Sequence, residues 1–335
     1  VMYSTDGISW TAASGVAASS WTSVIYANGK FVAVADGGTN KVMYSTDGIS
    51  WTSASSESSS WNSVTYGNGK FVAVATSGSN QVMYSTDGIS WTAASASEAS
   101  NWRSVTYGNG KFVAVANLGT NRVMYSTDAT NWTSASAAEA NSWYAVTYGD
   151  GKFVATATPG GVNQVMYSTD GINWTAASAA EEFFWYGLTY ADGKFVAVSN
   201  NGSNQVMYSA DGINWTSASA TEANQWYSVA YGDGKFVAVA RDGTNQVMYS
   251  ADGTGVDYST LTFTDNQDLA FLKSGDLLTS SASTALTPAF STTLYAGNTG
   301  TQKLDTGVDN TSKSLVWMKW TNITGGSTRA KPRFS

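Results

Sequence analysis

A repeat of about 41 residues dominates the sequence, and this period limits the folds that the chain can adopt. The phrase V-M-Y-S-[TA]-D occurs seven times, beginning at Val1, Val42, Val82, Val123, Val165, Val206 and Val247. A second phrase, W-x-x-[VL]-x-Y-x-[ND]-G-K-F-V-A, lies between these copies and begins six times, at Trp21, Trp61, Trp102, Trp143, Trp185 and Trp226. A unit of this length cannot bury both of its faces alone, so neighbouring units must stack to complete the core.

Each unit has the pattern of four short strands. Asn68-Gly69 and Asp87-Gly88 are tight-turn signals, because these residues tolerate the positive φ that such turns require. Around these turns, the second unit predicts strands at Ser63–Tyr66, Lys70–Ala75, Val82–Ser85 and Trp91–Ala94. Four antiparallel strands in about 40 residues are typical of a propeller blade. The sequence therefore predicts an all-β fold, a six-bladed β-propeller of four-stranded antiparallel blades.

The two ends of the repeat region affect the blade count. Six copies of the second phrase allow six complete blades, and a seven-bladed ring is the alternative. The chain begins with the last two strands of a unit at Val1–Ser14, and the unit that begins at Trp226 lacks the tryptophan of its fourth strand. We expect the ring to close by pairing of Val1–Ser14 with Tyr227–Ala240.

The repeat divides the chain into two regions. Residues 1–252 form the predicted propeller. Residues 253–335 form a small β-rich C-terminal segment, which is interpreted as an attachment segment or a truncated lectin-like module. The strands predicted in this segment are Thr260–Thr264, Thr292–Ala296 and Ser314–Trp320.

Composition disfavours several classes of function. The chain contains no Cys and no His, which removes disulfides, Cys- or His-based metal sites and His-dependent catalytic triads. Its net charge is −7 and it shows no basic patch, so nucleic acid is not an expected partner. No apolar run approaches the ~18 residues of a membrane span. We therefore expect no cofactor, no metal site, no nucleic-acid binding and no membrane insertion.

Differences among the repeats indicate where binding takes place. The Asn-Gly and Asp-Gly turns are nearly identical in every unit, and a propeller places both on one face. The opposite face carries the variable loops, where a rigid scaffold usually presents its binding residues. The residue after each blade-opening tryptophan also varies, and we expect it near the entrance of the central channel. The candidate ligand-binding residues are Trp102, Arg103, Trp143, Tyr144, Trp185, Tyr186, Trp226, Tyr227, Glu181, Glu182 and Arg241.

Structural interpretations stand beside these functional ones. Aromatic faces with neighbouring carboxylates and amides suit sugar binding, whereas the same tryptophans can instead form the core between blades. We expect the aspartates of the Asp-Gly turns to cap their own backbone rather than to bind Ca²⁺ or act in catalysis. We expect the repeated lysine after each hairpin turn to lie in solvent.

Two parts of the sequence resemble known families. The stretch S-T-D-G-I-S-W from Ser4, with its copies, resembles the Asp-box of sialidase-type propellers, although it is one residue shorter between Ser and Trp. This resemblance covers residues 1–252 and implies a propeller fold rather than sialidase activity. The stretches Y-A-G-N from Tyr295, T-Q-K-L-D-T-G from Thr301 and L-V-W-M-K from Leu315 resemble a segment of tailed-phage virion proteins, especially those of marine phages. There the pattern opens a β-rich, lectin-like module.

These features predict a non-catalytic virion protein, a tail fibre or capsid decoration, that binds host-surface carbohydrate through its variable face. The first alternative is a purely structural assembly protein whose variable face contacts other virion proteins. The second is a bacterial surface lectin or adhesin, located outside the cell or on its surface. A sialidase-like glycosidase is disfavoured, because a catalytic site breaks repeat symmetry strongly in one or two blades. The expected location is the virion, and a homo-oligomer is compatible with this role.

Overall fold

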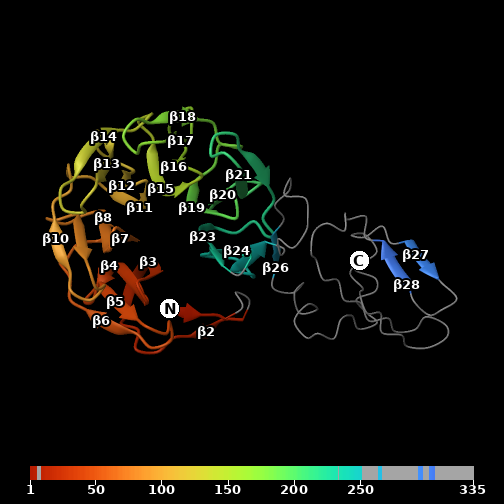
Figure 1. The fold of residues 1–335 in the computed structure, drawn as a ribbon, viewed down its shortest axis with the longest axis horizontal. Helices are drawn as coiled ribbons and strands as arrows, with labels where there is room; N and C mark the ends of the chain where they lie inside the picture. Colours follow the sequence, from red (N-terminus) through yellow and green to blue (C-terminus); the bar gives the residue numbers. More distant parts are fainter. Residues whose placement is uncertain (6–8, 233, 251–262, 266–292, 297–301, 306–335) are drawn as a thin grey trace.

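The computed structural model describes residues 1–5, 9–232, 234–250, 263–265, 293–296 and 302–305. Every regular element within these residues is a β-strand. The strands form six four-stranded antiparallel sheets and two sheets of two strands. Figure 1 shows the six larger sheets as blades around a ring, each with its first strand nearest the centre. The predicted six-bladed β-propeller is therefore confirmed.

The four strands of each blade are named A to D from the centre outward. The A strands are β3 (Ser19–Ala27), β7 (Trp61–Gly67), β11 (Trp102–Gly108), β15 (Ser142–Gly149), β19 (Trp185–Ala191) and β23 (Trp226–Gly232). The B strands are β4 (Lys30–Gly38), β8 (Lys70–Ala75), β12 (Lys111–Ala116), β16 (Lys152–Thr158), β20 (Lys194–Ser199) and β24 (Lys235–Ala240).

Strands C and D complete each blade toward its outer edge. The C strands are β5 (Val42–Ser45), β9 (Val82–Ser85), β13 (Arg122–Ser126), β17 (Val165–Ser168), β21 (Val206–Ser209) and β25 (Val247–Ser250). The D strands are β6 (Thr52–Ala54), β10 (Thr92–Ala94), β14 (Thr133–Ser136), β18 (Thr175–Ala177), β22 (Thr216–Ala218) and β26 (Phe263–Asp265).

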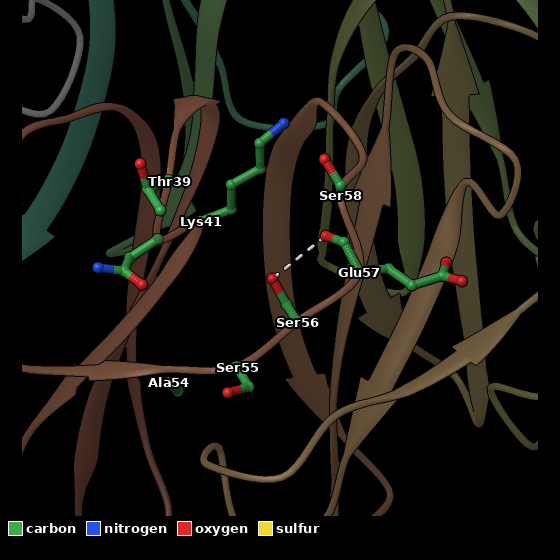
Figure 2. A pocket seen from close by; sticks show the side chains of 8 residues that line it. Thr39, Lys41, Ala54, Ser55, Ser56, Glu57 and Ser58 are labelled. Carbon is green, nitrogen blue, oxygen red and sulfur yellow. Dashed lines mark hydrogen bonds between the residues drawn. The ribbon is translucent and has the colours of Figure 1, made fainter.

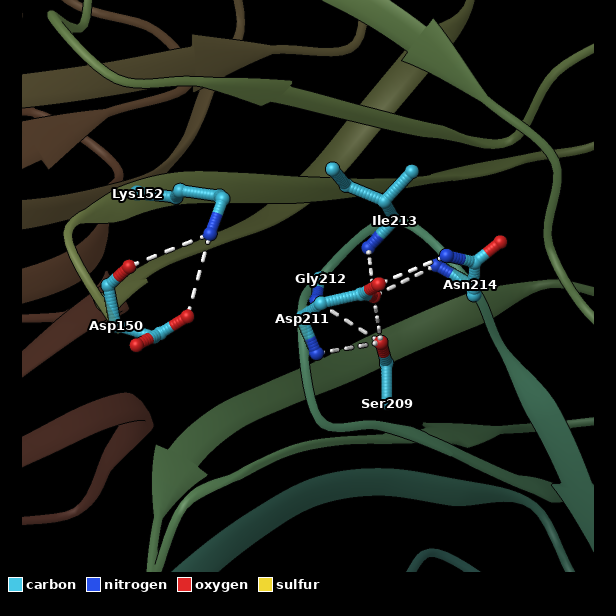
Figure 3. Close-up of polar contacts among 7 residues, drawn as sticks. All are labelled: Asp150, Lys152, Ser209, Asp211, Gly212, Ile213 and Asn214. Atoms are coloured by element: carbon cyan, nitrogen blue, oxygen red, sulfur yellow. Dashed lines mark hydrogen bonds and ion pairs between the residues drawn. The ribbon is translucent and has the colours of Figure 1, made fainter.

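The turn between strands C and D is held by a serine and an aspartate. In the fifth blade, Ser209 Oγ accepts hydrogen bonds from the N–H groups of Asp211 and Gly212, and Asp211 Oδ1 accepts from those of Ile213 and Asn214 (Figure 3). The same bonds recur in four other blades, at Ser45, Ser85, Ser126 and Ser168. The prediction that these aspartates cap their own backbone is confirmed.

The face of the propeller that carries the A–B and C–D turns also contains contacts between neighbouring blades. Lys70 Nζ, after the A–B turn of the second blade, donates to the carbonyl of Asp128 in the C–D turn of the third at 2.7 Å. The same ammonium lies 5.0 Å from the centroid of the Tyr84 ring. The prediction that the repeated lysines lie in solvent is therefore wrong for Lys70, because neighbouring turns on this face approach closely enough to share a cation.

Strand B carries the core on both of its faces. In β8, Phe71, Ala73 and Ala75 pack with Val32 and Val34 of the preceding blade. The opposite face of β8, Val72 and Val74, packs with Trp102, Val105 and Phe112 of the following blade. The core is therefore continuous from one blade to the next, which explains the unbroken apolar run that the repeat carries here.

The ends of the repeat region differ from the prediction. The N-terminal strands β1 (Met2–Tyr3) and β2 (Thr11–Ala12) pair with each other, not with Tyr227–Ala240. They attach instead to the first blade, because the N–H of Ser14 donates to Ile49 O and the N–H of Trp51 donates to Ser14 O. The sixth blade obtains its fourth strand from β26, which pairs with β25. Part of the segment assigned to residues 253–335 thus belongs to the propeller.

The other C-terminal predictions have mixed outcomes. The predicted strand Thr260–Thr264 overlaps β26, and Thr292–Ala296 corresponds to β27 (Thr293–Ala296), which pairs with β28 (Gln302–Asp305). The predicted strand Ser314–Trp320 lies outside the described residues. No helix of a length and apolarity that would cross a bilayer occurs in the described part of the chain.

Candidate ligand-binding site

A β-bulge follows the first tryptophan of every blade. In the pairing of strands A and B, the register skips one residue after Trp21, Trp61, Trp102, Trp143, Trp185 and Trp226. A bulge leaves that residue outside the hydrogen-bonded ladder and re-aims its side chain. The bulged residues are Thr22, Asn62, Arg103, Tyr144, Tyr186 and Tyr227, the same variable positions that the sequence singled out.

The bulged residues of consecutive blades contact one another. The rings of Tyr144 and Tyr186 meet edge to face with their centroids 4.7 Å apart, and those of Tyr186 and Tyr227 are 4.9 Å apart. The guanidinium of Arg103 lies 5.0 Å from the centroid of the Tyr144 ring. Phe184 stacks parallel to Tyr186 at 6.5 Å. We call Arg103, Tyr144, Tyr186 and Tyr227 the tyrosine cluster.

Polar groups surround the tyrosine cluster. The side-chain amide of Asn117 donates to the Tyr144 hydroxyl at 3.2 Å, and that of Asn200 donates to the Tyr227 hydroxyl at 3.4 Å. Burial, together with the neighbouring Tyr144 and Tyr227, raises the pKa of Tyr186 to about 12. Two buried polar atoms, Arg103 Nε and Asn117 Oδ1, have no hydrogen-bond partner among the described residues.

The predicted tryptophans are part of the core rather than of a binding surface. The side chains of Trp102, Trp143, Trp185 and Trp226 are fully buried between blades. Their indole N–H groups donate to the backbone carbonyls of residues four positions earlier, all of them glutamates. These four side chains therefore offer no surface to a ligand, and the structural interpretation holds for them.

The two glutamates predicted on the variable face lie in different surroundings. The carboxylate of Glu181 accepts a hydrogen bond from the side-chain amide of Asn204 at 2.7 Å. Equivalent Glu–Asn bonds recur between Glu57 and Asn80, and between Glu139 and Asn163. Glu181 therefore makes a loop contact that recurs in other blades. Its neighbour Glu182 is exposed, on the same connection as the exposed Phe184.

Arg241 occupies a position equivalent to two residues that reach the tyrosine cluster. It is exposed and directly follows strand β24, as Asn117 follows β12 and Asn200 follows β20. Those two asparagines contact the tyrosine of the next blade. Arg241 thus lies on the loop face in the sixth blade, where its backbone N–H donates to Gln225 O.

The residue that precedes the V-M-Y-S stretch of strand C forms a second repeated contact on the loop face. Arg122 donates through Nη1 to Asn141 O at 2.7 Å, and Lys41 donates through Nζ to Ser59 O at 2.9 Å. Gln205 makes the same bond to Asn224 O. These side chains hold the D–A connection of the next blade, so the charges of Lys41 and Arg122 serve the loop structure.

The sequence did not predict a pocket of about 160 Å³ on the loop face of the first blade. It lies between the loop around Lys41 and the connection that follows β6, with Glu57 on its far side (Figure 2). None of its eight lining residues is aromatic. No sequence signal distinguished it from the same loops of the other blades, because an Asn at the position of Asn40 occurs in all six units and a Glu at the position of Glu57 occurs in five. The tyrosine cluster presents more varied recognition chemistry than this pocket.

Comparisons with known proteins support the fold. No protein-family model matches the chain, and no curated protein matches its sequence. A solved streptogramin B lyase is similar over 75% of this chain and 86% of its own, with 12% identity and a TM-score of 0.63. A virginiamycin B lyase from Staphylococcus aureus, with quinupristin, is similar over 74% and 85%, with 13% identity and a TM-score of 0.62. YCF48 bound to a D1 peptide is similar over 75% and 82%, with 16% identity and a TM-score of 0.53. At these identities the shared feature is the β-propeller fold.

Proposed function

We propose that the chain is a non-catalytic propeller that binds carbohydrate at the tyrosine cluster. The observation that carries this proposal is the convergence of Tyr144, Tyr186 and Tyr227 from three successive blades, with their rings in contact. Tyrosine combines an apolar ring face with a polar tip, and this combination suits a ligand that presents C–H faces and hydroxyls. The amides of Asn117 and Asn200 add hydrogen-bonding groups at the same rim.

The arrangement of charged side chains favours binding over catalysis. Glu181 and Arg122 are engaged in loop contacts that recur from blade to blade. Two of the similar solved structures are lyases, and one of them is a catalytically inactive variant in which a histidine is replaced by alanine. This chain contains no His, so it has no residue of that type for the same chemistry.

The setting that we propose for this binding module is a virion appendage. The support is the resemblance of the stretches that begin at Tyr295, Thr301 and Leu315 to a segment of tailed-phage virion proteins. A tail fibre or capsid decoration displays a carbohydrate-binding face toward the host surface. A structural assembly protein and a bacterial surface lectin are the alternatives, and glycan binding separates the first of them from the proposal.

A glycan-array and whole-cell binding screen of the full chain tests the proposal. The comparison is with a variant that carries Tyr144→Ala, Tyr186→Ala and Tyr227→Ala. We expect the variant to lose binding that the unmodified chain shows. Leu118→Ala is the control, because Leu118 is exposed on a variable loop of the same face and lies outside the cluster. Absence of binding to every glycan and cell surface would overturn the proposal, as would binding that the triple variant retains.

A further inference from the structure

Arg103 is a cation without a counterion on the loop face. Its guanidinium lies 5.0 Å from the centroid of the Tyr144 ring, and no carboxylate among the described residues forms an ion pair with it. Arg122, in the same blade, differs from it, because Arg122 Nε donates to Gly119 O and Arg122 Nη1 donates to Asn141 O. Arg122 thus holds the loop structure through hydrogen bonds, whereas Arg103 Nε, which is buried, makes none with the described residues.

The acidic side chains on the neighbouring D–A connections have other partners. The carboxylate of Glu98 accepts hydrogen bonds from the backbone N–H and the side-chain amide of Asn121. The carboxylate of Glu139 accepts the same two bonds from Asn163. These bonds hold both glutamates against the loops of their own blades, so neither forms an ion pair with the guanidinium of Arg103.

A buried acceptor without a partner lies at the same tyrosine. Asn117 is 9% exposed, and its side-chain amide donates to the Tyr144 hydroxyl at 3.2 Å. Its Oδ1 atom has no hydrogen-bond partner in the described part of the chain, as is the case for Arg103 Nε. Buried polar atoms of folded proteins are almost always hydrogen-bonded. This donor and this acceptor are therefore suited to a ligand that supplies both kinds of partner.

Arg103 lies at one end of the tyrosine cluster. The rings of Tyr144, Tyr186 and Tyr227 follow it in the next three blades, and each ring contacts the next one. On the other side of Arg103, in the second blade, the bulged residue is Asn62, whose side-chain amide donates to Arg103 O. A saccharide whose ring faces lie on the tyrosines therefore meets the guanidinium at its end toward the third blade.

We propose that the ligand is an acidic saccharide of the uronate class, and that Arg103 and Asn117 bind its carboxylate-bearing sugar. This inference rests on the carbohydrate binding proposed above. A carboxylate accepts two parallel hydrogen bonds from the planar fork of a guanidinium, and Asn117 Oδ1 accepts one from a hydroxyl of the same sugar. A ligand that covers Arg103 removes its charge from water, which is unfavourable unless the ligand brings an opposite charge.

Binding to matched glycans tests this proposal. The probes are oligosaccharides of galacturonate, glucuronate and mannuronate, each beside a counterpart with its carboxylates reduced to primary alcohols and a second counterpart sulfated at those alcohols. We expect the full chain to bind at least one uronate at least tenfold more tightly than its reduced counterpart. Arg103→Gln should remove this preference, and Arg103→Lys should keep only part of it, because lysine has the charge without the planar fork. Thermal denaturation verifies that both variants are folded.

Lys111→Gln is the matched control for overall charge. Lys111 belongs to the same blade as Arg103 but follows its A–B turn, on the face opposite the variable loops. The variant changes the net charge of −7 by the same amount as Arg103→Gln does. It should keep the preference for the uronate, because the contact at Arg103 rather than the overall charge produces that preference.

Four results would overturn the inference. Three of them leave the proposed carbohydrate binding intact: equal affinity for every uronate and its reduced counterpart, a preference for the uronate that Arg103→Gln retains, and tighter binding of the sulfated counterpart than of the uronate. The fourth is the absence of binding to any glycan, which would overturn the inference and the proposed function together.

Discussion

One bulged residue per blade determines the chemistry at the inner rim of the loop face. Thr22 and Asn62 donate hydrogen bonds to backbone carbonyls of the next blade, whereas Tyr144, Tyr186 and Tyr227 contact each other through their rings. The sequence showed that this position varies and turns aromatic along the chain. It did not show the bulge, because a bulge arises from the register between two strands. It also did not separate the buried tryptophan from the neighbouring residue that is available for binding.

Alanine substitution at two glycines distinguishes the effect of backbone strain from that of steric crowding. Gly171 (φ +74°) and Gly151 (φ +71°) have similar left-handed conformations, but a Cβ on Gly171 would lie 2.8 Å from Val113 Cγ2, whereas one on Gly151 would meet nothing within 4 Å. We expect Gly151→Ala to lower the free energy of unfolding by about 1 kcal/mol and Gly171→Ala by about 2 kcal/mol. Chemical denaturation measures both, and equal losses would contradict the crowding at Gly171.

The aspartates of the C–D turns should make the free energy of unfolding depend on pH. The N–H groups of Ser90 and Ile89 hold the pKa of Asp87 below its ordinary value of 3.8. A carboxylate with a lowered pKa in the folded state stabilises the fold above its unfolded pKa, and this stabilisation is lost as the pH falls toward the folded value. We therefore expect Asp87→Asn to be less stable than the unmodified chain at pH 7, by a margin that shrinks below about pH 4. A margin that stays constant across a pH series of denaturation curves would be inconsistent with this account.

Among the features of the structure, the strands and the turns between them could be predicted best from the sequence. In the second blade, the predicted strands Lys70–Ala75 and Val82–Ser85 match β8 and β9 to the residue. They were predictable because every repeat carries two clear signals. The Asn-Gly and Asp-Gly turns mark the ends of strands, and the apolar sequence of strand B indicates burial on both of its faces. The loop contacts were not predictable, because each Glu–Asn bond joins the connection before strand A to the B–C loop about 23 positions later.

Adjacent glutamates on one connection test whether the loop contacts stabilise the blades. Glu181 bonds Asn204, whereas Glu182 is exposed. We expect Glu181→Ala to lower the free energy of unfolding by about 1–2 kcal/mol, because it removes a hydrogen bond to a charged group. Glu182→Ala should change it by less than about 0.5 kcal/mol, as is usual at exposed sites. If thermal denaturation shows the two variants to be equally stable, Glu181 is not a structural support.

At the scale of the whole molecule, the ring was predictable and its ends were not. The number of A–B phrases predicted six complete blades, as found. The fourth strand of the sixth blade, β26, has the sequence F-T-D and lacks the repeat's features. Outer strands impose weak sequence requirements, since most residues of a D strand such as β10 are exposed and the strand is held by backbone pairing with strand C. An extended segment without a motif can therefore complete a blade, and sequence alone does not identify it.

Asymmetry around the ring connects this architecture to the proposed function. The bulged positions are polar in the first two blades and hold Arg103 and three tyrosines in the other four. A scaffold that is otherwise nearly uniform thus concentrates its aromatic side chains on one part of the inner rim. In the function that we propose, the repeat supplies rigidity and one variable position per blade supplies recognition.

The most direct test is a calorimetric titration of the best-binding glycan into the unmodified chain, Tyr186→Phe and Tyr186→Ala. Tyr186 lies between the other two tyrosines, so it contacts any ligand that spans the cluster. We expect the phenylalanine variant to keep most of the affinity, because the ring face remains, and the alanine variant to lose about 1–3 kcal/mol of binding free energy or more. Equal affinity of the alanine variant and the unmodified chain would place the binding site elsewhere and contradict the account.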